Sequence, residues 1–231
     1  MHKGKKYQNN FKLIQNDSEY DLNDACNLIK DFVSYKFDES IDISIMIKKD
    51  TKNPIVKGSV VLPHGNGKKI RILLLTREGD QNESLKDKLG IDYVGGNSTI
   101  EEIQKKSFPL NYDYIITTPD MLVNLKKVAR VLGPKGLMPS INNGTVTTNI
   151  ENTVDILQKG KIYFKSNKNG VINTSIGRMS FEPKNIHDNF IAIFGSILKI
   201  KPSTTKGYYI KSASLSTTMG PSIKINFANL K

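Results

Sequence analysis

The chain has 231 residues, of which 38% are hydrophobic and 24% charged, so we expect a folded protein of one large or two modest domains. It lacks an apolar run of the roughly 18–20 residues that a membrane span requires, and its polar, basic N-terminus is unlike a secretory signal or a clear transit peptide. The net charge of +12 favours a polyanionic partner, above all a nucleic acid, with a merely basic protein as the alternative.

Residues that carry catalysis or bind metals are sparse. Cys26 is the lone cysteine and is interpreted as a core residue in a reducing compartment, and the three scattered histidines lack metal-ligand spacing, so no metal site is predicted. The loop around Gly65 and Gly67 has neither the first glycine of a phosphate loop nor a Ser or Thr after its lysine. We therefore expect no catalytic residues and no cofactor, and keep a nucleotide-dependent enzyme as a rival interpretation.

The N-terminal third combines a helix with half-buried strands. After a polar basic tail, apolar residues at helical spacing predict a helix over 21–32 with Asp21 as its cap. Isoleucines at every second position predict a strand within 36–49, and a second short strand is expected over 58–63.

The middle of the chain alternates continuously apolar strands with helices. Strands are expected at 70–76, 93–94 and 112–117, and helices at 82–90, 98–106 and 118–132. Ser98 with Glu101 forms an expected capping box, and Thr118-Pro119 is a typical helix start. This order predicts a three-layer, mainly parallel, Rossmann-like α/β domain with right-handed crossovers.

The C-terminal part returns to half-buried strands. We expect helices at 151–158 and 185–200, and strands at 161–166, 170–177, 208–217 and 222–227. The economical interpretation is an α+β domain built from residues 1–67 and 151–231, with an α/β domain inserted at 68–150. The chain then crosses twice, near Gly65 and Gly67 and near Gly144, which predicts a two-strand hinge. A single larger α/β domain is the alternative.

Small hydroxyl side chains gather near the C-terminus. Ser212, Ser214 and Ser216 lie on one face of the expected strand, and Thr217, Thr218, Met219 and Gly220 crowd the turn after it. Such groups suit ribose 2′-hydroxyls and phosphates at close approach. Lys36 and Phe37 fit the same surface. A solvated edge strand, with Phe37 in the core, is the alternative.

Motifs along nearly the whole chain carry a resemblance to a known family; in chain order they are KFDESIDI, GSVVLPHGNGKK, TPDM, VARVLGPKGLMPSINNGTVT and STTMGPS. Together they resemble the family of the large-subunit ribosomal protein L1, the stalk protein, in its bacterial or organellar form. The resemblance implies a two-domain structural protein that binds large-subunit ribosomal RNA at the stalk base as a monomer within the ribosome. It also implies help in releasing deacylated tRNA from the exit site and, for bacterial members, repression of the protein's own messenger RNA.

The resemblance also implies particular RNA contacts. Carried over by position, the RNA-facing set consists of Lys36, Phe37, Ser40, Ser212, Thr217, Thr218, Met219 and Gly220, with a second contact in the 170–177 hairpin at Gly170, Asn173 and Gly177. In the inserted domain Lys135 is a further candidate. The chain departs from the family at Ser40, where Thr is usual, at Asn173, where His is common, and at Ser140-Ile141-Asn142, where Asn-Pro-Lys is usual.

Charge and composition refine these expectations. Residues 68–150 hold 12 Lys and Arg and 9 Asp and Glu, so most of the positive charge lies in the end-built domain, which we expect to carry the RNA footprint. The chain is rich in Asn, Ile and Lys, which favours a mitochondrially encoded protein, with an AT-rich bacterium and its cytoplasm as the alternative. A regulatory protein that acts mainly on messenger RNA is the remaining rival.

Overall fold

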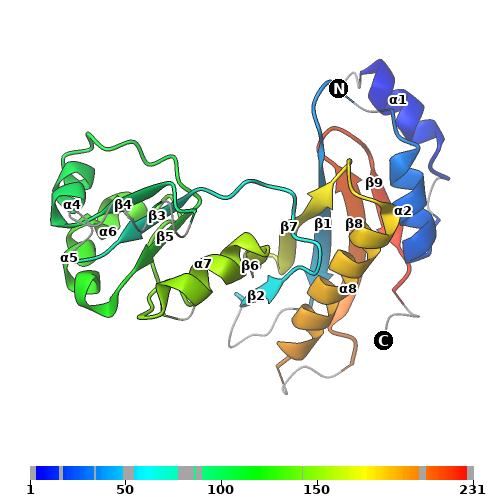
Figure 1. Ribbon diagram of the computed structural model, residues 1–231. Helices are drawn as coiled ribbons and strands as arrows, with labels where there is room; N and C mark the ends of the chain where they lie inside the picture. Colours follow the sequence, from blue (N-terminus) through cyan, green and yellow to red (C-terminus); the bar gives the residue numbers. More distant parts are fainter. Residues whose placement is uncertain are drawn as a thin grey trace. The chain divides into compact units, whose positions relative to one another are not determined.

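The computed structural model describes residues 4–15, 18–33, 35–48, 55–77, 86, 90–141, 143–202 and 207–227. By contacts the chain separates into two compact units (Figure 1). The end-built unit consists of residues 1–67 and 159–231, and the inserted unit consists of residues 68–158. The expected mixture of helices and strands is confirmed, as an α/β protein with several sheets. The helix expected at 82–90 lies almost wholly outside the described residues.

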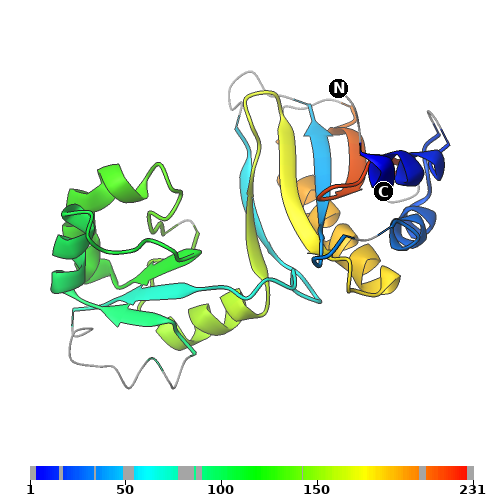
Figure 2. The same cartoon turned by 90° about the horizontal axis from the view of Figure 1, so that it is seen from above.

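The end-built unit is organised around an antiparallel sheet of four strands in the order β7-β1-β8-β9. Its elements are α1 (Lys5–Lys12), α2 (Leu22–Lys30), β1 (Ser40–Ile47), β2 (Lys57–Val61), β6 (Lys161–Lys165), β7 (Val171–Arg178), α8 (Pro183–Lys199), β8 (Ile210–Thr217) and β9 (Ser222–Ile225). Helices α2 and α8 pack against each other and against the sheet (Figures 1 and 2). Strands from both ends of the sequence therefore share one sheet.

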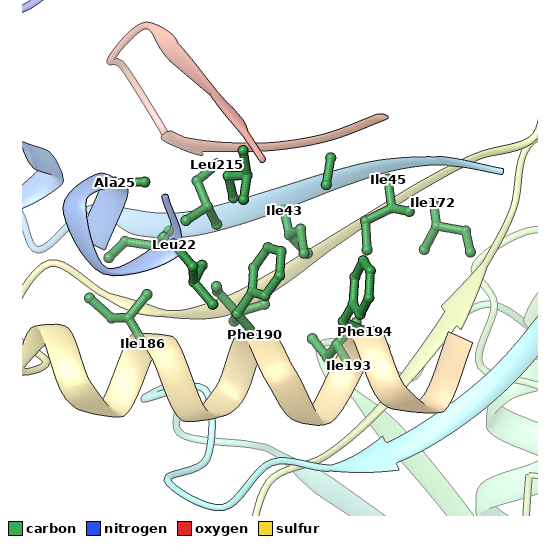
Figure 3. Close-up of a cluster of buried hydrophobic side chains, with 14 of the residues drawn as sticks. Leu22, Ala25, Ile43, Ile45, Ile172, Ile186, Phe190, Ile193, Phe194 and Leu215 are labelled. Carbon is green, nitrogen blue, oxygen red and sulfur yellow. The ribbon is translucent and has the colours of Figure 1, made fainter. Parts of the chain in front are cut away.

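The core of the end-built unit lies between this sheet and its two helices. In β1 the isoleucines at 41, 43, 45 and 47 are buried, whereas the residues between them are exposed or half-buried, as strand alternation requires. Figure 3 shows Phe190 and Phe194 of α8 pointing toward Ile43 and Ile45 of β1, with Leu22 of α2 beside them. The two phenylalanine rings stack with their centroids 5.9 Å apart. The predicted inward face of β1 is thus confirmed.

The expectation of a polar N-terminal tail is wrong for residues 5–12, which form helix α1. The helix is held by a contact with a residue distant in sequence. Asn10 is only 1% exposed, and its carboxamide is hydrogen-bonded to both backbone groups of Val33: the Val33 N–H donates to Oδ1 at 2.8 Å, and Nδ2 donates to the Val33 carbonyl at 3.5 Å. Such a clamp stabilises a short polar helix that its own propensity would leave marginal.

A second, two-stranded sheet pairs β2 with β6 and leads to the two chain crossings. Beyond it the backbones of Gly65 and Gly160 approach so closely that a Cβ on Gly160 would lie 2.4 Å from the Gly65 Cα. The buried Asn189 of α8 holds the first segment, since it donates to the carbonyl oxygens of Gly65 at 2.8 Å and Ile176 at 2.7 Å and accepts from the His64 N–H at 3.2 Å. The chain therefore leaves the end-built unit from a fixed position.

The inserted unit contains a parallel sheet of three strands in the order β4-β3-β5. Its elements are β3 (Ile72–Leu75), β4 (Tyr93–Gly95), α4 (Asn97–Gln104), β5 (Tyr114–Thr117), the 3-10 turn η1 (Pro119–Met121), α5 (Leu122–Leu125), η2 (Lys126–Val128), α6 (Ala129–Leu132) and α7 (Ile150–Gln158). All four residues of β3 are buried, as expected for a strand covered on both faces.

Two helix predictions in the inserted unit need correction. Helix α4 begins at Asn97 after Gly96, so Ser98 lies inside its first turn and is not the cap of a capping box. The helix expected at 118–132 is divided into η1, α5, η2 and α6. Its buried residues still line one core, with Leu125 and Leu132 packed beside Leu73 of β3. Packing of the apolar face therefore fixes the path of this segment, although regular helical hydrogen bonding is interrupted.

Residues 133–141 and 143–147, after α6, form a loop rich in Gly and Pro. Leu137 is buried in the core of the inserted unit. Thr145 ties the loop together, because its Oγ1 accepts from the Ser140 N–H at 2.9 Å and donates to the Ser140 carbonyl oxygen at 3.2 Å. The loop then pairs with β5 through a parallel bridge between Thr117 and Val146.

The boundary of the units differs from the sequence interpretation at α7. The sequence pattern predicts residues 151–158 in the end-built domain, whereas by contacts α7 belongs to the inserted unit. The carboxamide of Gln158, at the end of α7, donates to the Gly90 carbonyl oxygen at 3.4 Å within that unit. The second crossing consequently lies at Gln158–Lys159. Gly144 lies in a turn inside the inserted unit, where its N–H donates to the Ile141 carbonyl oxygen at 2.9 Å.

Candidate nucleic-acid interface

The face of the four-stranded sheet opposite the core carries rows of small polar side chains. Ser44 of β1 lies opposite Asn173 of β7 and Ser214 of β8, and Ser214 in turn lies opposite Lys224 of β9. The next row consists of Ser175, Asp42, Ser216 and Ser222. All these residues are exposed or half-buried. We call this surface, with Ser212 at one end, the polar sheet face.

The start of β1 and the end of β8 form one border of this face, where two hydroxyls meet. Ser40 Oγ and Thr218 Oγ1 are 2.9 Å apart, and Thr218 Oγ1 also accepts from the Ser40 backbone N–H at 3.1 Å. The Thr218 N–H donates to the Ser40 carbonyl oxygen at 3.1 Å. Both residues therefore sit at fixed positions at the surface, where hydroxyl oxygens can serve a ligand as donor or acceptor.

Met219 is held next to this pair by a buried carboxylate. The Glu39 side chain is 2% exposed, and its Oε2 accepts from the Met219 backbone N–H at 3.0 Å. The Met219 side chain itself is 49% exposed. Gly220 follows where no side chain fits, because a Cβ there would lie 2.3 Å from Thr217 Oγ1. We call Lys36, Phe37, Ser40, Thr218, Met219 and Gly220 the RNA-facing edge, after the contact that the resemblance implies for them.

Lys36 and Phe37 lie in the bend before β1, which begins only at Ser40. Lys36 is exposed, and the Phe37 ring is 51% exposed, so the alternative of Phe37 as a core residue is wrong. The ring centroids of Tyr35 and Phe37 are 6.3 Å apart. A cation and an aromatic ring thus stand together at the surface, a combination that suits phosphate contact and base stacking.

Sequence reasoning missed the acidic residues that brace this bend. Asp38 accepts hydrogen bonds from the Ser180 N–H at 3.0 Å and from the Ser180 hydroxyl at 2.9 Å. Arg178 Nη1 donates to the Asp38 carbonyl oxygen at 3.0 Å. The acidic residues directly after Lys36-Phe37 are the signal in the sequence that indicates such bracing.

Thr217, one of the residues predicted to contact a ligand, points into the protein and not to the surface. Its side chain is only 4% exposed, because Ser212, Ser214 and Ser216 face outward and strand alternation turns Thr217 inward. Thr217 therefore supports the edge from beneath and offers no side-chain surface to a ligand. Of the serines, Ser212 is exposed, while Ser214 and Ser216 are half-buried.

The hairpin residues of β7 also divide into presented and structural groups. Asn173 is exposed on the polar sheet face. Gly170 is buried in a turn with φ of +79°, and the Asn167 side chain accepts from the Val171 N–H at 2.9 Å in that turn. Gly177 is buried, and a Cβ there would lie 3.0 Å from the Phe181 ring. Of the three, only Asn173 exposes a side chain at the surface.

The remaining candidates lie away from the RNA-facing edge. Lys135 is exposed in the turn after α6, inside the inserted unit. Gly65 and Gly67 have φ of +64° and +69° and lie next to the first crossing. At Gly67 a Cβ would come 2.7 Å from Arg178 Cγ. Gly65 and Gly67 therefore lie in the segment that leads to the first crossing, whereas Gly144 does not lie at a crossing.

Charge is distributed unequally between the units. Residues 68–158 hold 12 Lys and Arg and 11 Asp and Glu, so nearly all of the net charge of +12 belongs to the end-built unit, which also carries the edge and the polar sheet face. Across the described residues, no group of three or more His, Cys, Asp or Glu side chains is arranged to hold a metal ion. Within the same residues, no helix is long and apolar enough to cross a membrane.

Comparison with known families agrees with the motifs. A model of the ribosomal protein L1p/L10e family, a family of structural proteins without enzymatic activity, matches residues 29–221. The matched span begins in α2 and ends directly after Gly220, so it includes the inserted unit, the polar sheet face and the whole RNA-facing edge. The chain therefore belongs to the ribosomal protein L1p/L10e family and is a ribosomal protein of the large subunit.

Proposed function

We propose that the end-built unit binds ribosomal RNA of the large subunit at the stalk base, through the RNA-facing edge and the adjoining polar sheet face. The observation that carries this proposal is the pair of locked hydroxyls, Ser40 and Thr218, beside the exposed side chains of Phe37 and Met219. Small hydroxyls suit ribose 2′-hydroxyls and phosphates, and flat or flexible apolar side chains suit unstacked bases and sugars.

Two further features support this proposal. The hydrogen bonds within the edge hold its polar atoms in place before any ligand arrives, which lowers the entropic cost of binding. The positive charge of the end-built unit supplies attraction to phosphates, a contribution that weakens as salt is raised. The proposal therefore assigns position to the hydroxyls and the salt-dependent part of the affinity to Lys and Arg.

Binding to defined RNA tests this proposal. The full-length protein is titrated with a transcript of the stalk base of large-subunit ribosomal RNA and with an unrelated folded RNA of equal length, at several salt concentrations. We expect the stalk-base transcript to bind at least about a hundredfold more tightly at 150 mM salt. Equal affinity for the two RNAs at every salt concentration would show binding by charge alone and would contradict the proposal.

We propose further that the protein acts as the mobile stalk and assists release of deacylated tRNA from the exit site. The division of the chain into two compact units, which only the two crossings at Gly67–Lys68 and Gln158–Lys159 connect along the chain, supports this role. Ribosomes depleted of the protein will release labelled exit-site tRNA more slowly than ribosomes to which it has been restored. Equal release rates would remove this part of the proposal.

As to location, we propose a mitochondrial ribosome. The support is compositional, because the chain is rich in Asn, Ile and Lys. Mass spectrometry of ribosomes purified separately from mitochondria and from cytoplasm checks this, with the protein expected in the mitochondrial large subunit. If the protein comes from a cell without mitochondria, as the bacterial alternative requires, the proposed location is contradicted.

A further inference from the structure

Helix α1 presents a basic outer face and lies outside the span that the family model matches. The helix contains Lys5, Lys6 and Lys12, and no acidic residue occurs over residues 4–15. Lys5 and Lys12 are seven positions apart, which places them on the same side of the helix, and both are exposed. The side chains of Gln8 and Asn9 are exposed as well. The outer face therefore offers cationic and amide groups, the donor types that contact phosphates.

The inner side of α1 is fixed to the segment that leads into the RNA-facing edge. Asn10 clamps the backbone of Val33 with two hydrogen bonds. Lys6 Nζ lies over the ring of Tyr35, 4.6 Å from its centroid. Both anchoring points fall within three residues of Lys36, on the stretch that follows α2 (Figure 1).

This attachment makes the basic face continuous with the RNA-facing edge. Tyr35 has the Lys6 ammonium over its ring, and its ring centroid is 6.3 Å from that of Phe37. Tyr7 and Phe11 stack on each other within α1, with centroids 6.2 Å apart. Lys6, Tyr35 and Phe37 thus form a continuous row of contacts that joins α1 to the RNA-facing edge.

We propose that α1 extends the RNA-binding surface: Lys5 and Lys12 contact phosphates of the RNA that lies on the edge, and Asn10 positions the helix for this contact. The inference rests on the proposed binding of stalk-base RNA. Charge complementarity and continuity with the edge favour RNA as the occupant. Because α1 lies outside the matched family span, its contribution is an addition to the edge rather than part of the family's matched motifs.

The test compares two matched pairs of substitutions in the full-length protein. One variant carries Lys5→Gln and Lys12→Gln, in the first turn and at the last residue of α1. The control carries Lys184→Gln and Lys199→Gln, in the first turn and at the last residue of α8, so the loss of charge is the same. Binding of the stalk-base transcript is measured between 50 and 300 mM salt.

We expect the α1 variant to bind about three- to tenfold more weakly at 100 mM salt, with a dependence of log affinity on log salt that is shallower by more than 1. We expect the α8 control to change the affinity less than twofold. If the two variants behave alike, the charge of α1 acts only through the net charge, and the inference is overturned.

Asn10→Ala supplies a second, independent readout. Loss of the clamp releases α1, so the lysine substitutions will have much less effect in the Asn10→Ala background than in the wild type. Full additivity of the two changes would contradict the positioning role of Asn10.

The outcomes also separate this inference from the proposed function. If the wild type distinguishes stalk-base RNA from unrelated RNA while the α1 variant matches the α8 control, the edge binds RNA and α1 does not. If the wild type fails to distinguish the two RNAs, the proposed function itself has failed. Equal weakening of the α1 variant toward both RNAs and toward anionic vesicles would show a general polyanion contact and would also overturn the inference.

Discussion

Ser40 and Thr218, which are 178 residues apart in sequence, are joined by both backbone and side-chain hydrogen bonds that connect the start of β1 to the turn after β8. Thr218 Oγ1 lies 2.9 Å from Ser40 Oγ and accepts from the Ser40 N–H at 3.1 Å, and the Thr218 N–H donates to the Ser40 carbonyl oxygen at 3.1 Å. The pair therefore closes the border of the sheet and presents two oriented hydroxyl groups at the surface.

Removal of this hydroxyl pair will destabilise the end-built unit in a non-additive manner. We expect Ser40→Ala and Thr218→Val each to lower the free energy of unfolding by about 0.5–1.5 kcal/mol, and the double variant to lose less than the sum, because each single change breaks the same contact. Urea denaturation measures the four proteins. Ser222→Ala in β9 is the control, with an expected change below about 0.5 kcal/mol. Strict additivity of the two changes would show that the hydroxyls act independently.

Substitution of Glu39 will separate its hydrogen bond from its charge. In Glu39→Gln an amide oxygen still accepts from the Met219 N–H, so we expect RNA affinity close to that of the wild type. In Glu39→Ala the part-buried Met219 N–H loses its partner, so we expect a cost of about 1–2 kcal/mol in stability and a weaker RNA complex. Thermal unfolding and RNA titration measure both variants. If Glu39→Gln binds as poorly as Glu39→Ala, the charge of Glu39 matters more than its position.

Asn189 will be among the most sensitive positions of α8. It is fully buried, and its side chain joins the Gly65 and Ile176 carbonyl oxygens to the His64 N–H. We expect Asn189→Ala to lower the free energy of unfolding by about 2–4 kcal/mol, since three backbone groups lose a partner. Asn185→Ala, one turn earlier and half-buried, is the matched control with a loss below about 1 kcal/mol. Equal losses at both positions would rule out a specific clamp.

Cys26 will resist thiol reagents while the protein is folded. Burial raises the pKa of the Cys26 thiol to about 12, so the reactive thiolate is scarce at pH 8 and the sulfur is shielded. We expect negligible reaction with a chromogenic disulfide reagent in buffer and one reactive thiol per chain in denaturant. Raising the pH from 7 to 9 in buffer will increase the rate, because the thiolate fraction grows as pH approaches the pKa. Rapid reaction of the folded protein at pH 7 would contradict the buried position of Cys26 in α2.

The regular parts of the fold could be predicted because their patterns are local. Alternating isoleucines define the inward face of β1, and the continuous apolar run at 72–75 defines a strand buried on both faces. The same alternation applied to β8 places Thr217 inward, opposite to Ser216. The resemblance places Thr217 in the RNA-facing set, whereas the structure buries its side chain, as strand alternation requires.

Features that depend on distant residues could not be predicted. Helix α1 has the composition of a polar tail, and its order depends on the clamp between Asn10 and Val33. Glu39 looks like a surface acid in the sequence, yet it is buried because the Met219 N–H, 180 residues away, needs an acceptor. Such pairings are set by the three-dimensional sheet and leave no periodic signal in the chain.

The central claim, that the edge around Thr218 and Met219 contacts RNA directly, is tested best by one titration. A Thr218→Ala and Met219→Ala double variant is compared with the wild type for binding of the stalk-base transcript over a range of salt concentrations, after urea denaturation has shown that both proteins are folded. We predict a loss of about 2–3 kcal/mol in binding free energy, with a nearly unchanged salt slope, because the lost contacts are uncharged. An unchanged affinity of the folded double variant would contradict the account.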